Sequence, residues 1–508
     1  MLTSPKSTGS PVGLRYTIVA VILVAIASAR IVANGIPLSH TMDEPIHFGG
    51  GMEWLWKGTY AWDTSHPPLP RLLAAGAASL AGARLVPADG AVLEAVGIWG
   101  RDQHYDRMLA ISRSGMLPIF WLACAIVFLW TTRIAGGTEA VAAVLVFTTI
   151  PPVLAHAGLI TTDMAATAFC AAGAFVSLLW AERPTRARTL LFGVALGCGV
   201  LGKFSVPIYL PAIWLLWLVW RRPSYAEIRA RIAPALTALA IGCFVLWAGY
   251  RFSMDGWLPA PKFWEGLAFL LKHNRDGHSS YIIGQRIQLG VWYFFPITLL
   301  VKTPLALILL TAAAAWRRPR GVALPVLYAA AILLVAMSSN INIGVRHVMP
   351  LYVGVSIAVG VLMVELWKTR ARLAVALLLA WQIGSGIVAQ PDLISYTNEI
   401  TRGRPEEWVA ESDLDWGQDM HRVADFLNRA GAREVSFTPY SIYYLQGGHH
   451  FPKCTFSDWY RPAPGWNVVS LSGWKVFNHP GWVKAPPQYR IGRTHWAWYF
   501  PPASSSNP

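Results

Sequence analysis

The sequence predicts a polytopic α-helical membrane protein with a small α/β domain at its C-terminal end. Three observations support this fold class. Hydrophobic residues make up 54% of the 508 residues and charged residues only 14%, whereas soluble domains carry roughly 25% charged residues. Apolar runs close to the ~20 residues needed to cross a bilayer recur from Tyr16 to Ala389. Beyond Gln390 these runs stop, and short alternating segments typical of strands replace them.

The apolar runs divide the membrane part into about eleven predicted spans. A mean hydropathy of +0.41 for the whole chain agrees with this number of spans. The stretch 69–86 is also apolar, but a span there would invert the charge pattern of every later loop, so we expect a helix at the membrane interface. The spans are expected at 16–33, 109–132, 138–157, 164–181, 189–202, 206–220, 232–249, 290–315, 322–339, 348–366 and 373–389.

The net charge of +15 orients these spans. The basic residues form short clusters between spans and not one soluble face, which argues against a nucleic-acid partner. Lys and Arg near the ends of spans stay on the cytoplasmic side. The short turns on the other side contain only two basic residues, Lys203 and Arg346. The N-terminus is therefore expected in the cytoplasm and the C-terminal end outside. The cytoplasmic clusters are Arg133; Arg183, Arg186 and Arg188; Arg221, Arg222, Arg229 and Arg231; Arg317, Arg318 and Arg320; and Lys368, Arg370 and Arg372.

The predicted organisation is a transmembrane domain over residues 1–389 and an extracytoplasmic α/β domain over 390–508. Two long outer loops, 34–108 and 251–289, interrupt the transmembrane domain. In the C-terminal domain, alternation predicts strands and an apolar face with helical spacing predicts a helix. The expected elements are strands at 434–439 and 467–471 and a helix at 419–430.

The first candidate site is an acidic pair, Asp43 and Glu44, shortly after the first span. A carboxylate at the mouth of a membrane cavity can deprotonate an acceptor hydroxyl. The alternative is a solvated loop or a helix start, which Pro45 would suit. Neighbouring residues point in different directions, so we expect one of the pair to be the base and the other its support.

Five further ionisable residues lie next to or inside predicted spans. Asp163 begins the fourth span, where a helix N-terminus alone would stabilise a carboxylate. Lys203 lies in an outer turn, where it could simply extend to the interface. Lys302 lies within a span, where an unpaired ammonium costs several kcal/mol, so it should face a cavity. Arg346 and His347 lie at the outer edge of the tenth span, where they could bind a phosphate or lipid headgroups.

The C-terminal domain contains the segment Asp415-Trp416-Gly417-Gln418. A tryptophan face stacks on sugars and an aspartate hydrogen-bonds hydroxyls, so Asp415 and Trp416 could bind an acceptor. Equally, Trp416 could pack the domain against the membrane part while Asp415 caps a turn. Taken with the other charges, the sequence predicts an outward-facing cavity whose carboxylates and cations suit a lipid phosphate.

These segments resemble the dolichyl-phosphate-mannose protein mannosyltransferases, that is glycosyltransferase family 39 of the C-type glycosyltransferase superfamily. The C-terminal domain is similar to a bacterial branch related to the lipid A aminoarabinose transferases. The order of the motifs along nearly the whole chain makes the resemblance specific. The matching segments are Asp43-Glu44, His66-Pro67-Pro68-Leu69, Thr162-Asp163-Met164, Gly202-Lys203, Gly284-Gln285, Tyr293-Phe294-Phe295-Pro296, Lys302-Thr303-Pro304, the Arg346 segment, Tyr396-Thr397-Asn398-Glu399 and the segment from Ser412 to Asp419.

The resemblance implies an inverting transfer of a sugar from a polyprenyl-phosphate donor to an unknown acceptor outside the membrane. It implies catalytic roles for Asp43, Glu44 and Asp163, with His66 in the cavity lining. Lys203, Arg346 and Lys302 would bind the donor phosphate, and His347, Asp415 and Trp416 would line the cavity or contact the acceptor. The second outer loop is too short for the β-trefoil insertion of the animal and fungal enzymes, and short loops favour a bacterial inner membrane.

Two questions stay open on the sequence. A lipid or lipid-linked sugar flippase would also need a cavity and buried charge, and it differs from an enzyme in spreading its charges along a path between the two sides. No cofactor is required by the expected reaction, although a Mg²⁺ or Mn²⁺ ion could use the oxygen ligands of Asp43, Glu44 and Asp163.

Overall fold

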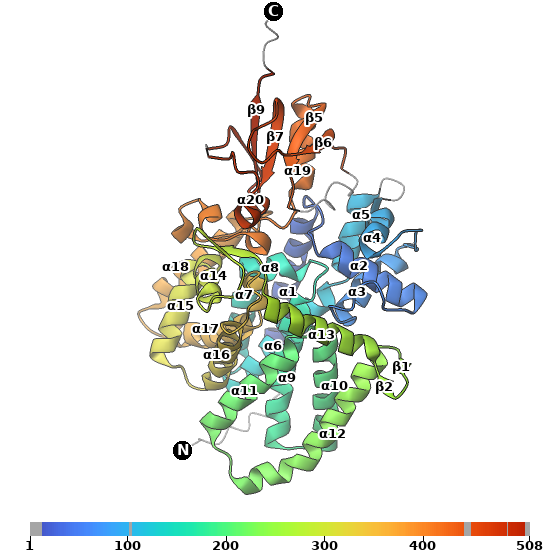
Figure 1. The fold of residues 1–508 in the computed structure, drawn as a ribbon. Helices are drawn as coiled ribbons and strands as arrows, with labels where there is room; N and C mark the ends of the chain where they lie inside the picture. The colour runs from blue at the N-terminus through green and yellow to red at the C-terminus, as the bar shows by residue number, and fades with distance from the viewer. Residues whose placement is uncertain (1–12, 101–103, 441–448, 485, 503–508) are drawn as a thin grey trace, which may run out of the picture.

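The computed structural model describes residues 13–100, 104–440, 449–484 and 486–502. Helices form a bundle from which the C-terminal sheet projects, with the first outer loop on the same end of the bundle as that sheet (Figure 1). The connection between α11 (Val206–Arg221) and α12 (Tyr225–Gly249) lies at the opposite end. The sheet and the first outer loop are thus placed to build one site together.

The described residues between 13 and 134 contain one long helix, α1, followed by the outer loop and a second long helical stretch. A π-helical turn, η1, follows α2 and ends at Gly58, which has the left-handed φ of +71° that glycine tolerates. The elements are α1 (Leu14–Gly35), α2 (Glu44–Met52), η1 (Glu53–Lys57), α3 (Leu69–Leu80), α4 (Ala91–Gly100), α5 (Tyr105–Ser114) and α6 (Leu117–Ile134).

The remaining helices of the bundle continue to residue 388, and the second outer loop separates α12 from α14. That loop contains two short hairpins and one helix: β1 (Met254–Asp255), β2 (Leu258–Pro259), α13 (Pro261–Asp276), β3 (Ser280–Ile282) and β4 (Gln285–Ile287). The bundle helices are α7 (Gly137–Phe147), α8 (Pro151–Ala157), α9 (Asp163–Glu182), α10 (Arg186–Gly202), α11, α12, α14 (Phe294–Lys302), α15 (Leu305–Arg317), α16 (Ala323–Ala336), α17 (Leu351–Trp367) and α18 (Arg372–Val388), with a 3-10 turn, η3 (Val345–His347), before α17.

Each predicted span contains a helix, but the spans are not equally long. Within the described residues, four helical stretches are long and apolar enough to cross a membrane: 14–35, 105–134, 163–182 and 225–249. Five other predicted spans are helices of only 14 to 17 residues.

The predictions of unbroken spans at 138–157 and 290–315 were wrong. Helices α7 and α8 meet at a bend of 73°, and α14 and α15 at a bend of 117°. Both breaks precede a proline, because the residue before a proline is driven out of the helical region. Ile150, before Pro151, and Thr303, before Pro304, are accordingly extended, with ψ of 117° and 134°.

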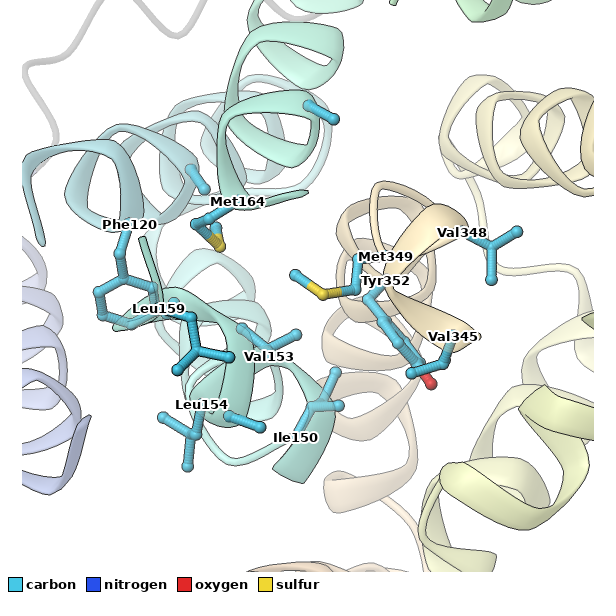
Figure 2. Close-up of a cluster of buried hydrophobic side chains, with 14 of the residues drawn as sticks. Phe120, Ile150, Val153, Leu154, Leu159, Met164, Val345, Val348, Met349 and Tyr352 are labelled. Atoms are coloured by element: carbon cyan, nitrogen blue, oxygen red, sulfur yellow. The ribbon is translucent and has the colours of Figure 1, made fainter. Parts of the chain in front are cut away.

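A buried hydrophobic cluster joins α8 and α9 to the start of α17 (Figure 2). In it Met164 and Val153 face Met349, and all three are fully buried. Met164 directly follows Asp163, and Val345 of the same cluster directly precedes Arg346. Close packing here leaves little room for adjustment, so it fixes the positions of both charged neighbours.

The C-terminal region forms a five-stranded sheet, which confirms the predicted α/β architecture. The strand order is β6-β5-β7-β9-β8, with β5 parallel to β6 and β7, and β9 antiparallel to β7 and β8. Helix α19 covers the sheet with its apolar face, which includes Val423 and Leu427. The elements are α19 (Met420–Arg429), β5 (Glu434–Thr438), β6 (Lys453–Phe456), β7 (Gly465–Ser470), α20 (Leu471–Phe477), β8 (Tyr489–Ile491) and β9 (His495–Phe500).

The start of this region binds the broken end of α14. The side chain of Asn398 donates to the carbonyls of Leu300 at 2.6 Å and Thr303 at 2.7 Å, and its backbone N–H donates to Val301 at 2.8 Å. Carbonyls at a helix end need such partners, above all away from water. In return, Lys302 Nζ donates to the carbonyls of Ile394 at 2.6 Å and Asp413 at 2.5 Å.

We therefore expect Lys302→Met to weaken the attachment of the C-terminal domain. The change leaves two buried carbonyls without their charged donor and should cost about 3 kcal/mol. The measurement is the melting temperature of the purified protein, together with the rate of proteolysis between residues 390 and 420. Lys262→Met, on the exposed face of α13, is the matched control. An unchanged melting temperature for Lys302→Met would contradict this assignment.

Candidate active site

A guanidinium group stands at the centre of the candidate site. Arg346 lies in η3, and its Nη1 donates to Asp43 Oδ2 at 2.8 Å and lies 3.6 Å from Asp163 Oδ2. Burial disfavours its charge, but the carboxylates of Asp43 and Asp163 outweigh this effect and raise its pKa. Arg346 is therefore a permanent cation held between two carboxylates.

Asp163 and Lys203 form the inner part of this cluster. Asp163 is the first residue of α9, and Lys203 directly follows α10. Lys203 Nζ is 2.5 Å from Asp163 Oδ1, and the hydroxyl of Thr161 donates to Asp163 Oδ2 at 2.9 Å. With a side-chain exposure of 1%, Asp163 is enclosed, and its charge holds the two cations in place.

Asp43 is the outer carboxylate of the cluster. It precedes α2 as the N-cap residue, yet its side chain makes no cap hydrogen bond and points to Arg346 instead. Its side-chain exposure of 25% exceeds the 14% of Lys203 and the 9% of Arg346. Asp43 is thus the carboxylate that a molecule arriving from solvent can reach.

Glu44 does not take part in this cluster, so the catalytic role predicted for it does not fit its position. It is fully buried and forms a bidentate pair with Arg113, at 2.8 Å from Nε and 2.7 Å from Nη2. The backbone N–H groups of Thr41 and Ile160 also donate to it, at 2.7 and 3.1 Å. Although burial raises its pKa, Arg113 and these donors lower it below the usual value. Glu44 is the support expected of one member of the pair.

The two histidines predicted to line the cavity have different surroundings. His66 has its Nδ1 3.1 Å from Asp63, a carboxylate that is also paired with the buried Arg71. The ring of His66 contacts that of His47 at 4.5 Å between centroids. Burial, followed by the charges of Lys203 and Arg346, holds the pKa of His347 well below its usual value and favours the neutral ring.

The C-terminal domain contributes Trp416 to the cluster. The guanidinium of Arg346 lies over the Trp416 ring, 4.2 Å from its centroid, in a cation–π contact. The ring of His156 lies 5.9 Å away. Trp416 is 2% exposed, so in this structure it packs the domain against the cluster.

Two other predicted residues, Lys302 and Asp415, form hydrogen bonds outside this cluster. Lys302 donates to two carbonyls at the domain junction, which leaves donor-phosphate binding without geometric support there. Asp415 is completely buried and accepts hydrogen bonds from the hydroxyl of Ser470 and from the N–H groups of Gly417 and Ser472, both at 3.2 Å. Its carboxylate organises the C-terminal domain and is not presented to an acceptor.

The same domain holds both outer segments of the site by their backbones. The N–H of Met42, next to Asp43, donates to the carbonyl of Trp416 at 2.9 Å. The N–H of Val345, next to Arg346, donates to Asp413 Oδ1 at 3.0 Å. A Cβ at Gly344 would lie 2.7 Å from the Ser412 hydroxyl oxygen, so glycine is required for this approach.

The sequence did not reveal Arg113, which neutralises Glu44, or the pair formed by His278 and Glu411, 3.3 Å apart. His278 lies in the second outer loop and Glu411 in a 3-10 turn, η6 (Glu411–Asp413), before Trp416. The only signal available was the position of Glu411 just ahead of the Ser412–Asp419 motif.

The carboxylates predicted as oxygen ligands for a divalent cation are paired with arginine side chains. Asp43 and Asp163 pair with Arg346, whereas Glu44 faces Arg113. Across the described ranges, no group of three or more His, Cys, Asp and Glu side chains has an arrangement that could hold a metal ion. In this arrangement the three carboxylates bind guanidinium groups, and a role for Mg²⁺ or Mn²⁺ stays a prediction.

Residues 20–258 match the sequence profile of the dolichyl-phosphate-mannose-protein mannosyltransferases. The matched part, less than half of the chain, is similar to that family. It contains Asp43, Asp163 and Lys203, while Arg346 and the C-terminal domain lie beyond the match. A search of curated protein sequences gave no match.

The fold of the whole chain is that of ArnT from Cupriavidus metallidurans. The structure of ArnT bound to undecaprenyl phosphate superposes with a TM-score of 0.54 over 94% of this chain and 97% of that one, at 13% identity. Its apo structure gives the same score and identity over 95% and 98%. The Saccharomyces cerevisiae Pmt1–Pmt2 complex matches with a TM-score of only 0.35 over 48% of this chain and 34% of that one, at 19% identity. The predicted fold class, a polytopic helical membrane protein with the fold of the C-type glycosyltransferases, is confirmed.

Glu44→Ala tests the support that this pair gives to the Asp43 loop. Removing one partner leaves the Arg113 cation buried and unpaired, which should cost about 3–5 kcal/mol. The free energy of unfolding is compared with that of Glu265→Ala, whose carboxylate is half exposed on α13 and should contribute less than about 1 kcal/mol. Equal stability of the two variants would show that the buried pair is not a support.

Proposed function

We propose that the protein is an inverting glycosyltransferase that moves a hexose or pentose from a polyprenyl-phosphate donor to a hydroxyl of an envelope lipid, glycan or protein. The observation that carries the proposal is the meeting of Asp43, Asp163, Lys203 and Arg346, which come from four separate segments of the chain. A reactive carboxylate and two cations at one point suit a reaction in which an anionic phosphate departs.

The comparisons support the same class of reaction. The family whose profile matches residues 20–258 is named for its dolichyl-phosphate-mannose donor, and the ArnT structure contains undecaprenyl phosphate. Both names refer to a sugar carrier made of a polyprenyl chain and a phosphate. Their shared chemistry, not the particular sugar, is what we assign to this chain.

The donor phosphate is assigned to Arg346 and Lys203. Arg346 has a guanidinium Nε that is buried and finds no hydrogen-bond partner among the described residues. A phosphate oxygen can accept from such a group, and a planar guanidinium can hold two oxygens at once. Lys203 supplies a second positive charge on the other side of Asp163.

Asp43 is assigned as the base. The acceptor oxygen attacks the anomeric carbon from the side opposite the phosphate, the bond from that carbon to the phosphate oxygen breaks, and the hydroxyl proton passes to Asp43. The electron pair of the broken bond leaves on the polyprenyl phosphate, where Arg346 and Lys203 balance it. One displacement inverts the anomeric centre, so the configuration of the product tests the scheme.

The reaction is proposed on the extracytoplasmic face of a bacterial inner membrane. The basic residues of the chain cluster in loops assigned to the cytoplasmic side, and the cluster around Arg346 lies at the other ends of the same spans. The C-terminal domain would then also be extracytoplasmic, in agreement with its contacts to Asp43 and Arg346 segments.

A flippase for a lipid or a lipid-linked sugar is the second candidate. Such a protein needs polar groups along a path between the two sides of the membrane. Here the ion pairs of the predicted site residues converge on one guanidinium. This convergence favours the enzyme.

Asp43→Asn should abolish transfer while donor binding is retained, because the amide keeps the shape of the side chain but cannot take the proton. Arg346→Lys should weaken binding of the donor by about tenfold, since the bidentate group is lost. The assay uses purified protein in lipid, radiolabelled undecaprenyl-phosphate sugars and a membrane extract as acceptor.

Exposed Arg404, paired at the surface with Glu407, provides Arg404→Lys as the matched control. Turnover by Asp43→Asn at the wild-type rate would remove Asp43 from the mechanism. Movement of the lipid across a vesicle wall that persists in Asp43→Asn, without any transfer, would establish the flippase instead.

A further inference from the structure

Glu411 is a buried residue of the C-terminal domain, and one of its two carboxylate oxygens has no hydrogen-bond partner among the described residues. Its Oε1 accepts a hydrogen bond from the hydroxyl of Tyr440 at 2.8 Å and lies 3.3 Å from Nε2 of His278. Its Oε2 is buried and has no hydrogen-bond partner in the described part of the chain. The residue is only 2% exposed. An oxygen of this kind is costly to leave unsatisfied, so its missing partner requires an explanation.

The backbone of Glu411 is strained as well. Its φ of +51° lies in the left-handed region, which a residue with a Cβ enters at a cost of roughly 1–2 kcal/mol. The surroundings enforce this conformation: the N–H of Glu411 donates to the Ser472 hydroxyl at 2.7 Å, and its carbonyl accepts from Leu414 and Asp415 at 2.8 Å. Glycine would occupy the position without strain. The retained side chain, strained and incompletely bonded, is a combination found at functional sites.

Glu411 lies beside the candidate active site. The next two residues of η6, Ser412 and Asp413, pack on Gly344 and hydrogen-bond the segment that carries Arg346. The carboxylate of Glu411 is among the charges that raise the pKa of Arg346. On its other side, His278 has 29% of its side chain exposed, which connects the pair to solvent.

Asp415, four residues further on, shows what a purely structural carboxylate looks like in this domain. Both of its oxygens accept hydrogen bonds from the domain itself. Glu411 differs because Tyr440 and His278 fix one oxygen while the other has no hydrogen-bond partner among the described residues. The fixed oxygen orients the carboxylate, and orientation before binding is what a recognition group needs.

We propose that Glu411 is a substrate-binding residue whose Oε2 accepts a hydrogen bond from a sugar hydroxyl, with Tyr440 and His278 as the residues that position it. The inference rests on the proposed glycosyl transfer and extends it to the recognition of the carbohydrate. The hydroxyl belongs either to the sugar on the donor or to a carbohydrate acceptor, and both present the same hydrogen-bond donor. A charged acceptor makes a strong bond to it.

The test compares Glu411→Gln with wild type in binding and in turnover. The binding probes are undecaprenyl phosphate and the undecaprenyl-phosphate sugar that wild type turns over. Glu411→Gln should bind the bare lipid phosphate like wild type but lose about tenfold in affinity for the sugar-bearing lipid, or show a KM for the acceptor raised about tenfold. The first result places the hydroxyl on the donor, and the second places it on the acceptor.

Two variants exclude a loss of folding as the cause. Glu407→Gln, at an exposed position of the same region, should behave like wild type in every assay. Glu411→Gly removes the backbone strain, so its melting temperature should equal or exceed that of wild type. Its affinity for the sugar-bearing lipid should fall, or its KM for the acceptor should rise, at least as much as in Glu411→Gln.

Unchanged donor preference together with an unchanged acceptor KM in Glu411→Gln would overturn the inference. That result differs from failure of the proposed function, in which wild type itself neither prefers a sugar-bearing lipid nor transfers sugar. A fall in melting temperature of Glu411→Gly, with the two binding measurements unchanged in Glu411→Gln, would make Glu411 a structural residue only.

Discussion

The site depends on one buried cation, Arg346, and on the carboxylates that neutralise it. A guanidinium enclosed at this depth needs opposite charges, because its desolvation costs several kcal/mol. Asp43 supplies one of them from a position 303 residues away in the sequence, and Asp163, which also holds Lys203, supplies the other. Four segments must therefore meet: the start of α9, the end of α10, the start of α2 and the turn before α17. The hydrophobic cluster next to Asp163 and Arg346 keeps them together.

The C-terminal domain is part of this site and not an appendage to it. It stacks Trp416 on Arg346, pairs with the backbone of the Asp43 loop and accepts from the Arg346 segment through Asp413. The family profile ends at residue 258, before Arg346, Asp413 and Trp416. The matched part thus supplies Asp43, Asp163 and Lys203, and the remainder of the chain supplies Arg346, the cation that joins the two carboxylates.

The sequence predicted most of the fold, because apolar length and charge bias are local properties of a membrane segment. It also predicted Asp43, Asp163, Lys203 and Arg346, which the structure brings together. It could not distinguish Lys302 and Asp415 from them, since a buried charge has the same appearance in a sequence whether it bonds backbone carbonyls, hydroxyls or a ligand. Glu411 was missed for the opposite reason: nothing local reveals a left-handed backbone or an oxygen without a partner.

The pairing of Asp43 with Arg346 has a consequence for the proposed reaction. While the two groups are 2.8 Å apart, the guanidinium occupies the carboxylate oxygen that would take a proton. A donor phosphate can accept two hydrogen bonds from a guanidinium and binds it more strongly than a single carboxylate oxygen does. The donor phosphate therefore competes directly with Asp43 for Arg346. Asp163 and the Trp416 ring keep Arg346 in place during this exchange. Binding of the donor would in this way release the base, so that Asp43 becomes available to an acceptor only when there is a sugar to transfer.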